Sequence, residues 1–204
     1  MRTIDNSLIQ SASDLIAEGY FDSPAHEYIC PDPTNRFKQL SSLLGSNLRL
    51  QISRGADSFC LAENCEVQAM GFWTRPNERK VGIMAMIQGG LLVAPFRVGF
   101  GVLFRAMSVS KRVEMQLTQA LGNKPFLYLN NMIVKKEIRG QGVGSKLLQR
   151  QMEAMEAKYT NPTFALATQK LENIRFYERL GFRTALQERI GAEEAGFLNW
   201  IMVR

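Results

Sequence analysis

The sequence predicts an α/β protein in which a mixed sheet carries helices on its faces. Two observations support this fold class. The second half of the chain alternates strand and helix patterns and ends in two strands, as expected of a mixed sheet covered by helices. The chain has 204 residues, of which 46% are hydrophobic and 22% charged, and this composition is ordinary for one globular domain with its own core.

The first half is interpreted as helices around one hairpin. Apolar residues recur at helical spacing near the start, and two strand-like runs flank a short polar turn. The expected elements are a helix within Leu8–Ile16, a connection at residues 22–33, a short helix over Arg36–Leu44 ended by Gly45, strands at residues 58–62 and 67–74 around the turn Glu63–Glu66, and a stop at Pro76.

The second half is more regular. A glycine-rich turn joins its first strand to an amphipathic helix, and Gly181 takes a good helix C-cap position. The expected elements are a strand at Phe126–Val134, a helix from the turn to about Lys158, a strand at Thr163–Thr168, a short helix at Asn173–Leu180, and strands at Phe182–Ile190 and Phe197–Val203.

A long apolar stretch, residues 81–104, raises the question of a membrane span, which needs about 20 mostly apolar residues. Gly89, Gly90, Pro95 and Arg97 interrupt the stretch, and an arginine near the middle of a bilayer is costly. We therefore interpret it as two short buried or pocket-lining helices, broken at Gly89-Gly90 and at Pro95.

The formal net charge of +6 suggests an anionic partner but does not identify it. The basic residues are scattered and form no run with interleaved aromatics, which argues against a nucleic-acid surface. With Cys30, Cys60, Cys65 and the single histidine His26, neither a disulfide framework nor a metal site is expected. No signal peptide is visible at the start, so a cytoplasmic location is predicted.

A glycine-rich turn, Arg139-Gly-Gln-Gly-Val-Gly-Ser-Lys146, lies between a strand and an amphipathic helix. Glycine lets the backbone turn sharply and approach a ligand, and a helix start offers unpaired N–H groups and a positive dipole end. Lys135 and Lys136 place further positive charge nearby. The pattern indicates a site for phosphate or pyrophosphate, with a merely tight basic turn as the alternative.

The spacing of the turn excludes two familiar phosphate loops. A P-loop requires lysine directly after its last glycine, whereas Ser145 follows Gly144. The dinucleotide fingerprint requires G-x-G-x-x-G, whereas Gly140, Gly142 and Gly144 give G-x-G-x-G. The turn alone therefore does not name its ligand.

Two motifs resemble a known family. Val134 to Gly144 looks like motif A of the GNAT (Gcn5-related) N-acetyltransferases, whose core is Arg/Gln-x-x-Gly-x-Gly/Ala, with Arg139, Gly142 and Gly144 in those positions. Asn173 to Phe182, which reads Asn-Ile-Arg-Phe-Tyr-Glu-Arg-Leu-Gly-Phe, resembles motif B of the same family. The two motifs occur in the right order, which makes the pair far more specific than either one.

Looser similarities extend beyond the two motifs. Tyr20–Pro24, Phe72–Pro76 and Trp200–Arg204 are similar to the subgroup that includes puromycin N-acetyltransferase. The resemblance implies the GNAT fold, a mixed, mostly antiparallel central sheet with helices on both faces. It also implies one domain, residues 1–204, with an acceptor-shaping half at 1–121 and an acetyl-CoA-binding half at 122–204.

The resemblance implies acetyl-CoA as donor, an amine as acceptor, and no metal. Motif A would cradle the pyrophosphate, and the strand before it would pair with the pantetheine arm as an added strand would. A backbone N–H there could hold the thioester oxygen, although apolar strand residues have packing as their alternative role. The implied cofactor-binding residues are Met132, Ile133, Val134, Arg139, Gly140, Gln141, Gly142, Val143, Gly144, Ser145, Asn173 and Phe176.

Tyr177 takes the general-acid position of motif B and is the predicted catalytic residue. A tyrosine with a pKa about 10 is neutral at pH 7 and carries the proton that a leaving CoA thiolate needs. The alternative is an aromatic side chain packed beside Phe176. Asn173 matches the family's CoA-contacting asparagine, and it would also suit a helix N-cap.

The general base is left open. An alkyl amine with a pKa near 10.4 is mostly protonated at pH 7, so a base, a water chain or a desolvating pocket must remove its proton. By residue type alone the candidates are His26, Asp22 and Glu114, each with an ordinary solvated role as the alternative. Asn130 and Asn131 could position a water but cannot act as bases.

The predicted function is acetyl transfer to the primary amine of a small molecule by direct attack in a ternary complex. The alternatives are a non-catalytic CoA-binding sensor with a closed acceptor pocket and an acetyltransferase acting on a protein or peptide. The expected partners are acetyl-CoA and the amine, without nucleic acid or membrane, and a homodimer is left open. Residues 78–121 match little in the family, and acceptor contacts are expected there.

Overall fold

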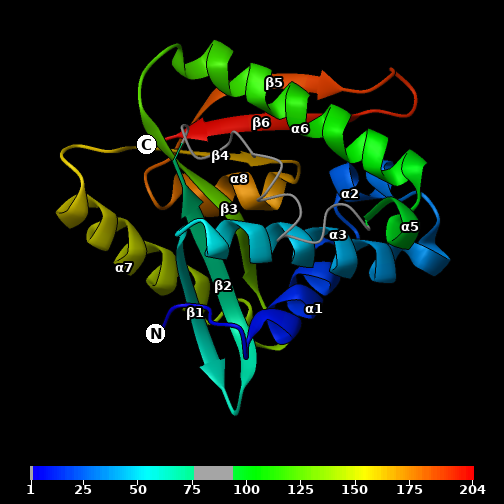
Figure 1. Cartoon of the computed structure of the whole chain (residues 1–204). Coiled ribbons are helices and arrows are strands. Elements are labelled where there is room, and N and C mark those ends of the chain that lie inside the picture. Colours follow the sequence, from blue (N-terminus) through cyan, green and yellow to red (C-terminus); the bar gives the residue numbers. More distant parts are fainter. Residues whose placement is uncertain (1, 76–93) are drawn as a thin grey trace.

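The structure, a computed structural model, describes residues 2–75 and 94–204. These residues form a six-stranded sheet with the order β1-β2-β3-β4-β6-β5 (Figure 1). Within this sheet β3 and β4 are parallel, and the other neighbouring pairs are antiparallel. The strands are β1 (Asp57–Glu63), β2 (Glu66–Thr74), β3 (Phe126–Val134), β4 (Thr163–Thr168), β5 (Arg183–Ile190) and β6 (Phe197–Val203).

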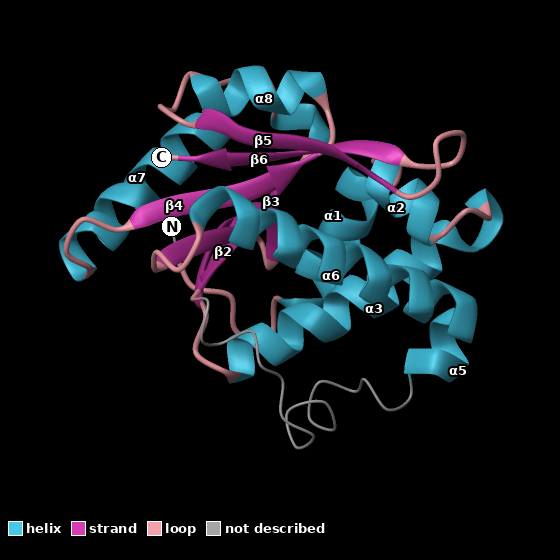
Figure 2. Cartoon of the chain, turned by 90° about the horizontal axis from the view of Figure 1, so that it is seen from above, coloured by secondary structure: helices cyan, strands magenta, loops and turns pink. Residues whose placement is uncertain are grey.

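Helices cover both faces of the sheet, which confirms the predicted fold class (Figure 2). On β2, Trp73 lies in a core with Leu148 of α7, whereas Phe72 lies in a core with Ile16 of α1. Successive side chains of a strand point to opposite faces, so β2 is buried on both. The described helices are α1 (Ile9–Tyr20), α2 (Pro24–Ile29), α3 (Pro33–Ser53), α5 (Ala94–Val98), α6 (Phe100–Leu121), α7 (Val143–Lys158) and α8 (Leu171–Glu178).

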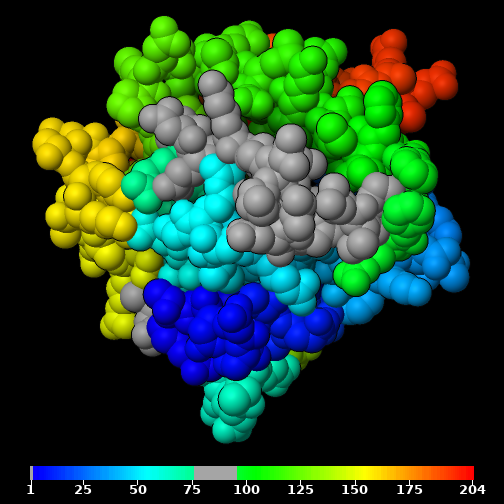
Figure 3. Space-filling view, in the orientation of Figure 1, coloured from blue at the N-terminus to red at the C-terminus, as the bar shows by residue number. Residues whose placement is uncertain are grey.

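The helices divide unequally between the two faces. α7 and α8 share one core with the sheet, and α1, α3 and α6 lie on the other face. In the space-filling view, α1 (blue), α3 (cyan) and α6 (green) follow one another across the surface (Figure 3). α6 packs on β4 and β6, where Leu117 shares a core with Ala165 and Ile201. One face is therefore covered mostly by helices from the first part of the chain.

The predicted elements of the second half are confirmed, with small shifts at the starts of α8 and β5 and at the end of α8, which lies at Glu178 and not at Leu180, with Arg179 as its C-cap. α8 begins at Leu171, two residues before the predicted Asn173, because Lys170 is the extended residue that precedes the helix. The hairpin of the first half is also confirmed. Asn64 and Cys65 at its turn both have positive φ, at 48° and 63°, as two-residue hairpin turns of type I′ require.

Two predictions for the first half are wrong. α3 runs for 21 residues and passes through Gly45, which was predicted to end it. A Cβ at Gly45 would lie 2.6 Å from Ser13 Oγ, so this glycine allows close packing of α3 on α1. Residues 22–33, predicted as a connection, contain α2. Its first residue, Pro24, is well placed there because the first helical N–H needs no partner within the helix.

The apolar stretch at residues 81–104 is described only from residue 94, and the predicted break at Gly89-Gly90 lies outside the described residues. Pro95 is the second residue of α5, and because the residues before Ala94 are not described, the break at Pro95 stays a prediction. A further interruption, which was not predicted, lies at Gly99, with φ +89°, between α5 and α6. Of the side chains in this segment, those of Val98 and Val102 are buried. Those of Phe96, Phe100 and Phe104 are mostly exposed.

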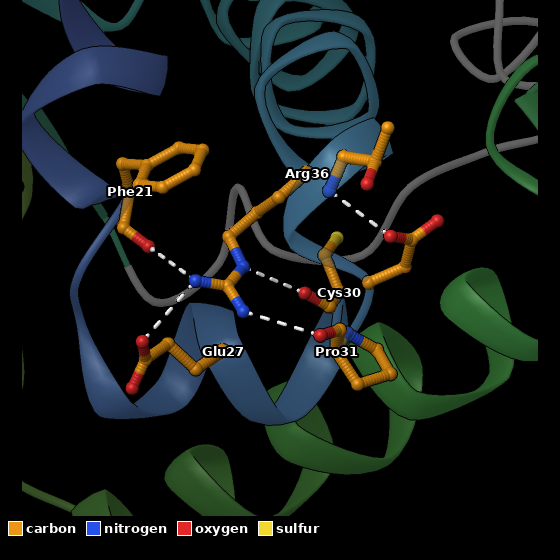
Figure 4. A network of polar contacts seen from close by, with 7 residues as sticks. Phe21, Glu27, Cys30, Pro31 and Arg36 are labelled. Carbon is orange, nitrogen blue, oxygen red and sulfur yellow. Dashed lines mark hydrogen bonds and ion pairs between the residues drawn. The ribbon is translucent and has the colours of Figure 1, made fainter.

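The buried side chain of Arg36 fixes the corner between α1, α2 and α3 (Figure 4). Its Nε donates to the carbonyl of Cys30 at 2.8 Å, and its Nη1 donates to the carbonyl of Phe21 at 3.2 Å. Nη1 also contacts a carboxylate oxygen of Glu27 at 3.1 Å, and Nη2 donates to the carbonyl of Pro31 at 3.3 Å. Arg36 thus satisfies carbonyl groups that the ends of α1 and α2 leave free.

Candidate active site

A cavity forms where β3 and β4 separate. Phe126–Tyr128 of β3 pairs with Thr163–Ala165 of β4, and the two strands do not pair beyond these residues. On its other edge, β4 pairs with β6 through Ala165–Thr168. Beyond Tyr128, β3 therefore has no partner on its β4 side among the described strands. A cavity of about 1080 Å³ occupies this region, lined by β3, the end of β4, the glycine-rich turn, α8, and parts of α1, α2, α3 and α6.

A β-bulge shapes the β3 wall of the cavity. Met70 pairs with Ile133 and Phe72 with Asn130, so one residue of β2, Gly71, faces two residues of β3. Asn131, one of these two, has φ +48°. A bulge of this kind redirects the backbone locally and is frequent beside active sites. Met132 is the other of the two, Ile133 and Val134 follow the bulge, and all three predicted contact residues line the cavity.

The glycine-rich turn has the geometry of an anion cradle. Gly140 and Gly142 have φ of +77° and +75°, a backbone region that favours glycine. α7 begins directly after Gly142, and no side chain caps it. Its first N–H groups therefore have no acceptor within the helix, and they lie at the positive end of the helix dipole. Arg139, Gly140 and residues 142–145 line the cavity, and the binding of a phosphate there stays a prediction.

Gly144 keeps the cradle open at its base. A Cβ at this position would lie 3.0 Å from Val134 Cγ2 and 3.6 Å from the ring of Phe176. The glycine therefore lets the start of α7 approach β3 and α8. Of the predicted pyrophosphate and CoA contacts, Gln141 is exposed and absent from the cavity lining, whereas Phe176 lines it.

The positive charge around the turn is distributed differently from the prediction. Lys135 forms an ion pair with Glu66 of β2, so part of its charge is already neutralised. Arg139 lines the cavity, and its Nε donates to the carbonyl of Val134 at 2.8 Å, which ties the turn to the end of β3. Lys170 and Arg179, at the two ends of α8, also line the cavity.

Tyr177 lies on α8, buried to 8% exposure, and lines the cavity. Its ring centroid lies 5.0 Å from that of Phe176 and 5.7 Å from that of Phe182. Burial raises the pKa of Tyr177, and the nearby Tyr128 raises it further. The phenol therefore stays protonated across the physiological range and is available as a hydrogen-bond donor or acid.

Asn173 also lines the cavity, but it does not cap a helix. The residue before α8 is Lys170, and Asn173 is the third residue of the helix. Its Nδ2 donates to Thr168 Oγ1 at 3.2 Å, which ties α8 to the end of β4. The N-cap alternative for Asn173 is therefore wrong, while contact with a ligand in the cavity stays a prediction.

His26 and Glu114 line the cavity, whereas Asp22 is exposed and is not among the lining residues. The ring of His26 stacks on that of Tyr20, with centroids 4.5 Å apart and 18° between the planes. Burial lowers the pKa of His26 to about 4, so the imidazole is neutral at pH 7 and is a weak base. Asn130 lines the cavity and donates from Nδ2 to Thr74 Oγ1 at 3.4 Å.

Several lining residues escaped the sequence prediction. Tyr128 alternates with Leu127 and Leu129 on β3, and that alternation could have placed it on the opposite face. Tyr20 lies at the end of a predicted helix, where nothing local indicated that it faces a cavity. The polar lining residues that were not predicted include Ser23, Asn47, Gln51, Ser110, Gln169 and Lys170.

A buried chain of amides runs from the cavity to α6. Gln169, which lines the cavity, donates from Nε2 to Asn199 Oδ1 at 2.6 Å. Asn199, fully buried on β6, donates from Nδ2 to Gln116 Oε1 of α6 at 2.7 Å. Gln116 in turn donates to Glu188 of β5 at 3.4 Å. The chain links α6 to the connection between β4 and α8.

Two further properties concern residues 2–75 and 94–204 alone. None of their helices combines the length and the apolar character that crossing a membrane requires. None of their His, Cys, Asp and Glu side chains form a group of three that could hold a metal ion.

The splayed sheet, the glycine cradle and the buried tyrosine beside it define an enzyme of the acetyltransferase class. A family model described as an acetyltransferase (GNAT) domain matches residues 55–184. The chain therefore belongs to the GNAT acetyltransferase family and is an acyltransferase, and the family takes acetyl-CoA as its cosubstrate. No protein of curated function matches the chain in sequence.

Solved structures share the fold over almost the whole chain. A histone acetyltransferase HPA2 and related acetyltransferase from Corynebacterium glutamicum has 18% identity and a TM-score of 0.64, covering 99% of this chain and 93% of that one. Arylalkylamine N-acetyltransferase 2 from Aedes aegypti has 14% identity and a TM-score of 0.61, covering 100% and 96%. An N-acetyltransferase from Staphylococcus aureus has 13% identity and a TM-score of 0.57, covering 99% and 94%.

Proposed function

We propose that this enzyme transfers the acetyl group of acetyl-CoA to the primary amine of a small molecule by direct attack in a ternary complex. One observation carries the proposal: a single cavity extends from the glycine-rich turn past Tyr177 to residues of α1, α2, α3 and α6. Donor and acceptor can therefore lie together in one enclosure. None of the three cysteines lines that cavity, which fits transfer without an acyl-cysteine intermediate.

The donor site is assigned to the second part of the chain, residues 122–204. The backbone from Arg139 to Ser145 would hold the pyrophosphate through the free N–H groups at the start of α7. Met132, Ile133 and Val134 would offer main-chain groups to the pantetheine amides, because β3 has no β4 partner there. Asn173 and Phe176 would contact the same arm from α8. Bound acetyl-CoA supplies an acyl group activated by its thioester.

Tyr177 is assigned as the general acid. Burial keeps its phenol protonated, and the residue lines the cavity that we assign to both donor and acceptor. As the C–S bond breaks, the tyrosine would donate its proton to the CoA sulfur, and the proton of the attacking amine would restore the phenol.

The replacement Tyr177→Phe tests this assignment, because it keeps the ring and its contacts with Phe176 and Phe182 and removes the proton. We expect kcat to fall at least about tenfold, with little change in acetyl-CoA affinity. The control is Tyr159→Phe, which alters a tyrosine at the C-terminal end of α7 that does not line the cavity. An unchanged kcat in Tyr177→Phe would remove Tyr177 from the mechanism.

Further assignments concern the acceptor side, the subgroup, the location and the partners. Residues 1–121 are proposed as the acceptor-shaping half, and the described part of α6 supports this with Leu103, Met107 and Glu114 in the cavity lining. Similarity to the puromycin N-acetyltransferase subgroup rests on the sequence segments alone. A cytoplasmic location fits three free cysteines, two of them buried. A homodimer is left open, and no nucleic-acid or membrane partner is proposed.

The non-catalytic sensor would need a closed acceptor pocket, and the cavity of about 1080 Å³ argues against it. Acetyl-CoA with a panel of amines, followed by release of free thiol, separates the two functions. Thiol release that depends on the amine supports the enzyme. Tight CoA binding without turnover on any amine or peptide would establish the sensor instead, and turnover restricted to peptides would establish the protein acetyltransferase.

A further inference from the structure

The cavity has two chemically different ends. Around the glycine-rich turn and α8 it is bordered by charged side chains. At the other end, formed by α1, α2, α3 and α6, most of the wall is aromatic and aliphatic, and its polar members include Ser23, Asn47, Gln51, Ser110 and Glu114. The residues of that end that carry the argument are Tyr20, His26, Ile29, Leu43, Leu103 and Val113.

Tyr20 and His26 form a stacked pair of rings, here called the Tyr20–His26 wall, at the apolar end. Their rings are nearly parallel and 4.5 Å apart, and both residues line the cavity. Tyr128 of β3 and Tyr177 of α8 border the same space. Aromatic rings prefer other flat rings in offset or edge-to-face contact, so this set of rings is shaped for a planar apolar group.

Two ionisable groups of this end, His26 and Tyr20, are held neutral. Burial lowers the pKa of His26 to about 4 and raises that of Tyr20, and Tyr177 and Tyr128 raise the pKa of Tyr20 further. The described charged groups in the lining are Glu114 on α6 at this end, and Arg139, Lys170, Glu172 and Arg179 at the turn and α8. Glu114 is exposed, so no buried carboxylate among the described residues is placed to hold a second ammonium group.

We propose, resting on the proposed function, that the acceptor is a monoamine carried on an aromatic ring, which packs against the Tyr20–His26 wall. Among the described residues, the second ammonium group of a linear diamine or polyamine would find no buried counter-charge, and burying an unpaired charge is costly. A simple alkylamine would fill the apolar space without ring contacts. The cavity therefore ranks aromatic monoamines first, alkylamines second and diamines last.

The same surroundings favour the neutral form of the amine. An apolar wall disfavours the ammonium form, so the amine is taken up after its proton has left to solvent. Its nitrogen lone pair then forms the C–N bond to the acetyl carbon while the C–S bond breaks. The sulfur receives one proton, the amide nitrogen loses one, and the products are the N-acetylamine and CoA with its free thiol. A dedicated carboxylate base is not required by this sequence of steps.

Equilibrium binding to the enzyme loaded with CoA tests the acceptor class apart from catalysis. The probes are 2-phenylethylamine, hexylamine and 1,6-diaminohexane, measured by calorimetry at pH 8. We expect 2-phenylethylamine to bind at least about tenfold more tightly than the other two. The variant Tyr20→Leu should reduce this preference over hexylamine to within about threefold, whereas Tyr20→Phe, which keeps the ring, should retain it.

Two outcomes overturn the inference: 1,6-diaminohexane binds as tightly as 2-phenylethylamine, or folded Tyr20→Leu keeps the aromatic preference. The unfolding temperature of each variant shows whether it is folded. If Tyr20→Leu is not folded, the aromatic preference measured with Tyr20→Phe decides the question. Thiol release with acetyl-CoA and the same amines tests the proposed function. Tight binding of 2-phenylethylamine without thiol release contradicts acetyl transfer and supports the acceptor class, and equal turnover of the diamine contradicts the class alone.

Discussion

The two sides of the cavity are built in different ways. The side assigned to acetyl-CoA consists mainly of backbone from one continuous segment, the end of β3, the glycine-rich turn and the start of α7. The side assigned to the acceptor consists of side chains from α1, α2, α3 and α6, brought together by tertiary packing. A backbone site needs glycine and correct dihedral angles, whereas a side-chain wall needs the helices that carry it to be fixed in position.

This difference predicts different sensitivities. The donor side should tolerate changes of exposed side chains and fail when a glycine is replaced. The acceptor side should fail when the polar contacts that position its helices are removed, even far from the cavity. The predictions below test this contrast, beginning with the largest expected effect.

The largest effect is expected at Gly144. In Gly144→Val the new side chain meets Val134, whose Cγ2 lies 3.0 Å from the Cβ position, and it pushes the start of α7 away from β3. We expect acetyl-CoA affinity to fall about 100-fold, measured by calorimetry. Gln141→Ala in the same turn is the control, because Gln141 is exposed and bonds only the carbonyl of Glu137. Equal affinities of the two variants would contradict the backbone cradle.

The donor side could be predicted from sequence because its parts are consecutive. A strand, three spaced glycines and an amphipathic helix follow within a few residues, and local rules for turns and helix starts apply directly to them. The bulge at Asn131 was not predicted, because it depends on the pairing of β3 with Gly71 of β2. The ion pair of Lys135 with Glu66 was not predicted either, because it also depends on the pairing of β3 with β2.

The acceptor side could not be predicted because its signals are not local. Gly45 lies inside α3, because it allows close packing of α3 on Ser13 of α1 and does not end the helix. Tyr20 and Tyr128 are 108 residues apart in the sequence, and only the fold brings both to the cavity. His26 was named by residue type, and its stacking on Tyr20 emerged from the structure.

The second prediction concerns Arg36, the polar support of the acceptor side. Arg36→Met fills similar space but leaves the carbonyls of Phe21, Cys30 and Pro31 without the donor that Arg36 supplies. We expect the free energy of unfolding to fall by about 3 kcal/mol, measured in urea, and the KM for the amine to rise while the KM for acetyl-CoA stays unchanged. Lys38→Met removes the same charge from an exposed position of α3 and should change neither. A rise in both KM values for Arg36→Met would show that the two sides are not separable.

The third prediction is a pH dependence carried by His26. Its pKa is about 4 in the folded protein against 6.5 as the ordinary value. Because the unfolded chain binds this proton more readily, the stabilisation is complete above pH 6.5 and is lost as the pH falls toward 4. Between pH 7 and pH 4.5 we expect wild type to lose about 2 kcal/mol more of its unfolding free energy than His26→Phe. The phenylalanine keeps the stack on Tyr20 without a titrating group, so identical pH profiles would contradict the burial of a neutral imidazole.

The smallest effect is expected where the two sides meet, at Asn199. This side chain joins Gln116 of α6 to Gln169 beside α8, so it connects an acceptor helix to the donor side through the sheet. Asn199→Leu and Gln116→Leu each leave a buried amide without its partner, whereas the double variant removes two partners at once. We therefore expect the double variant to be more stable than the sum of the single effects predicts, by about 1 kcal/mol. Urea unfolding of the four proteins measures this coupling. Strict additivity would mean that α6 is held independently of the β4–α8 connection, and the two sides would then be separate in energy as well as in construction.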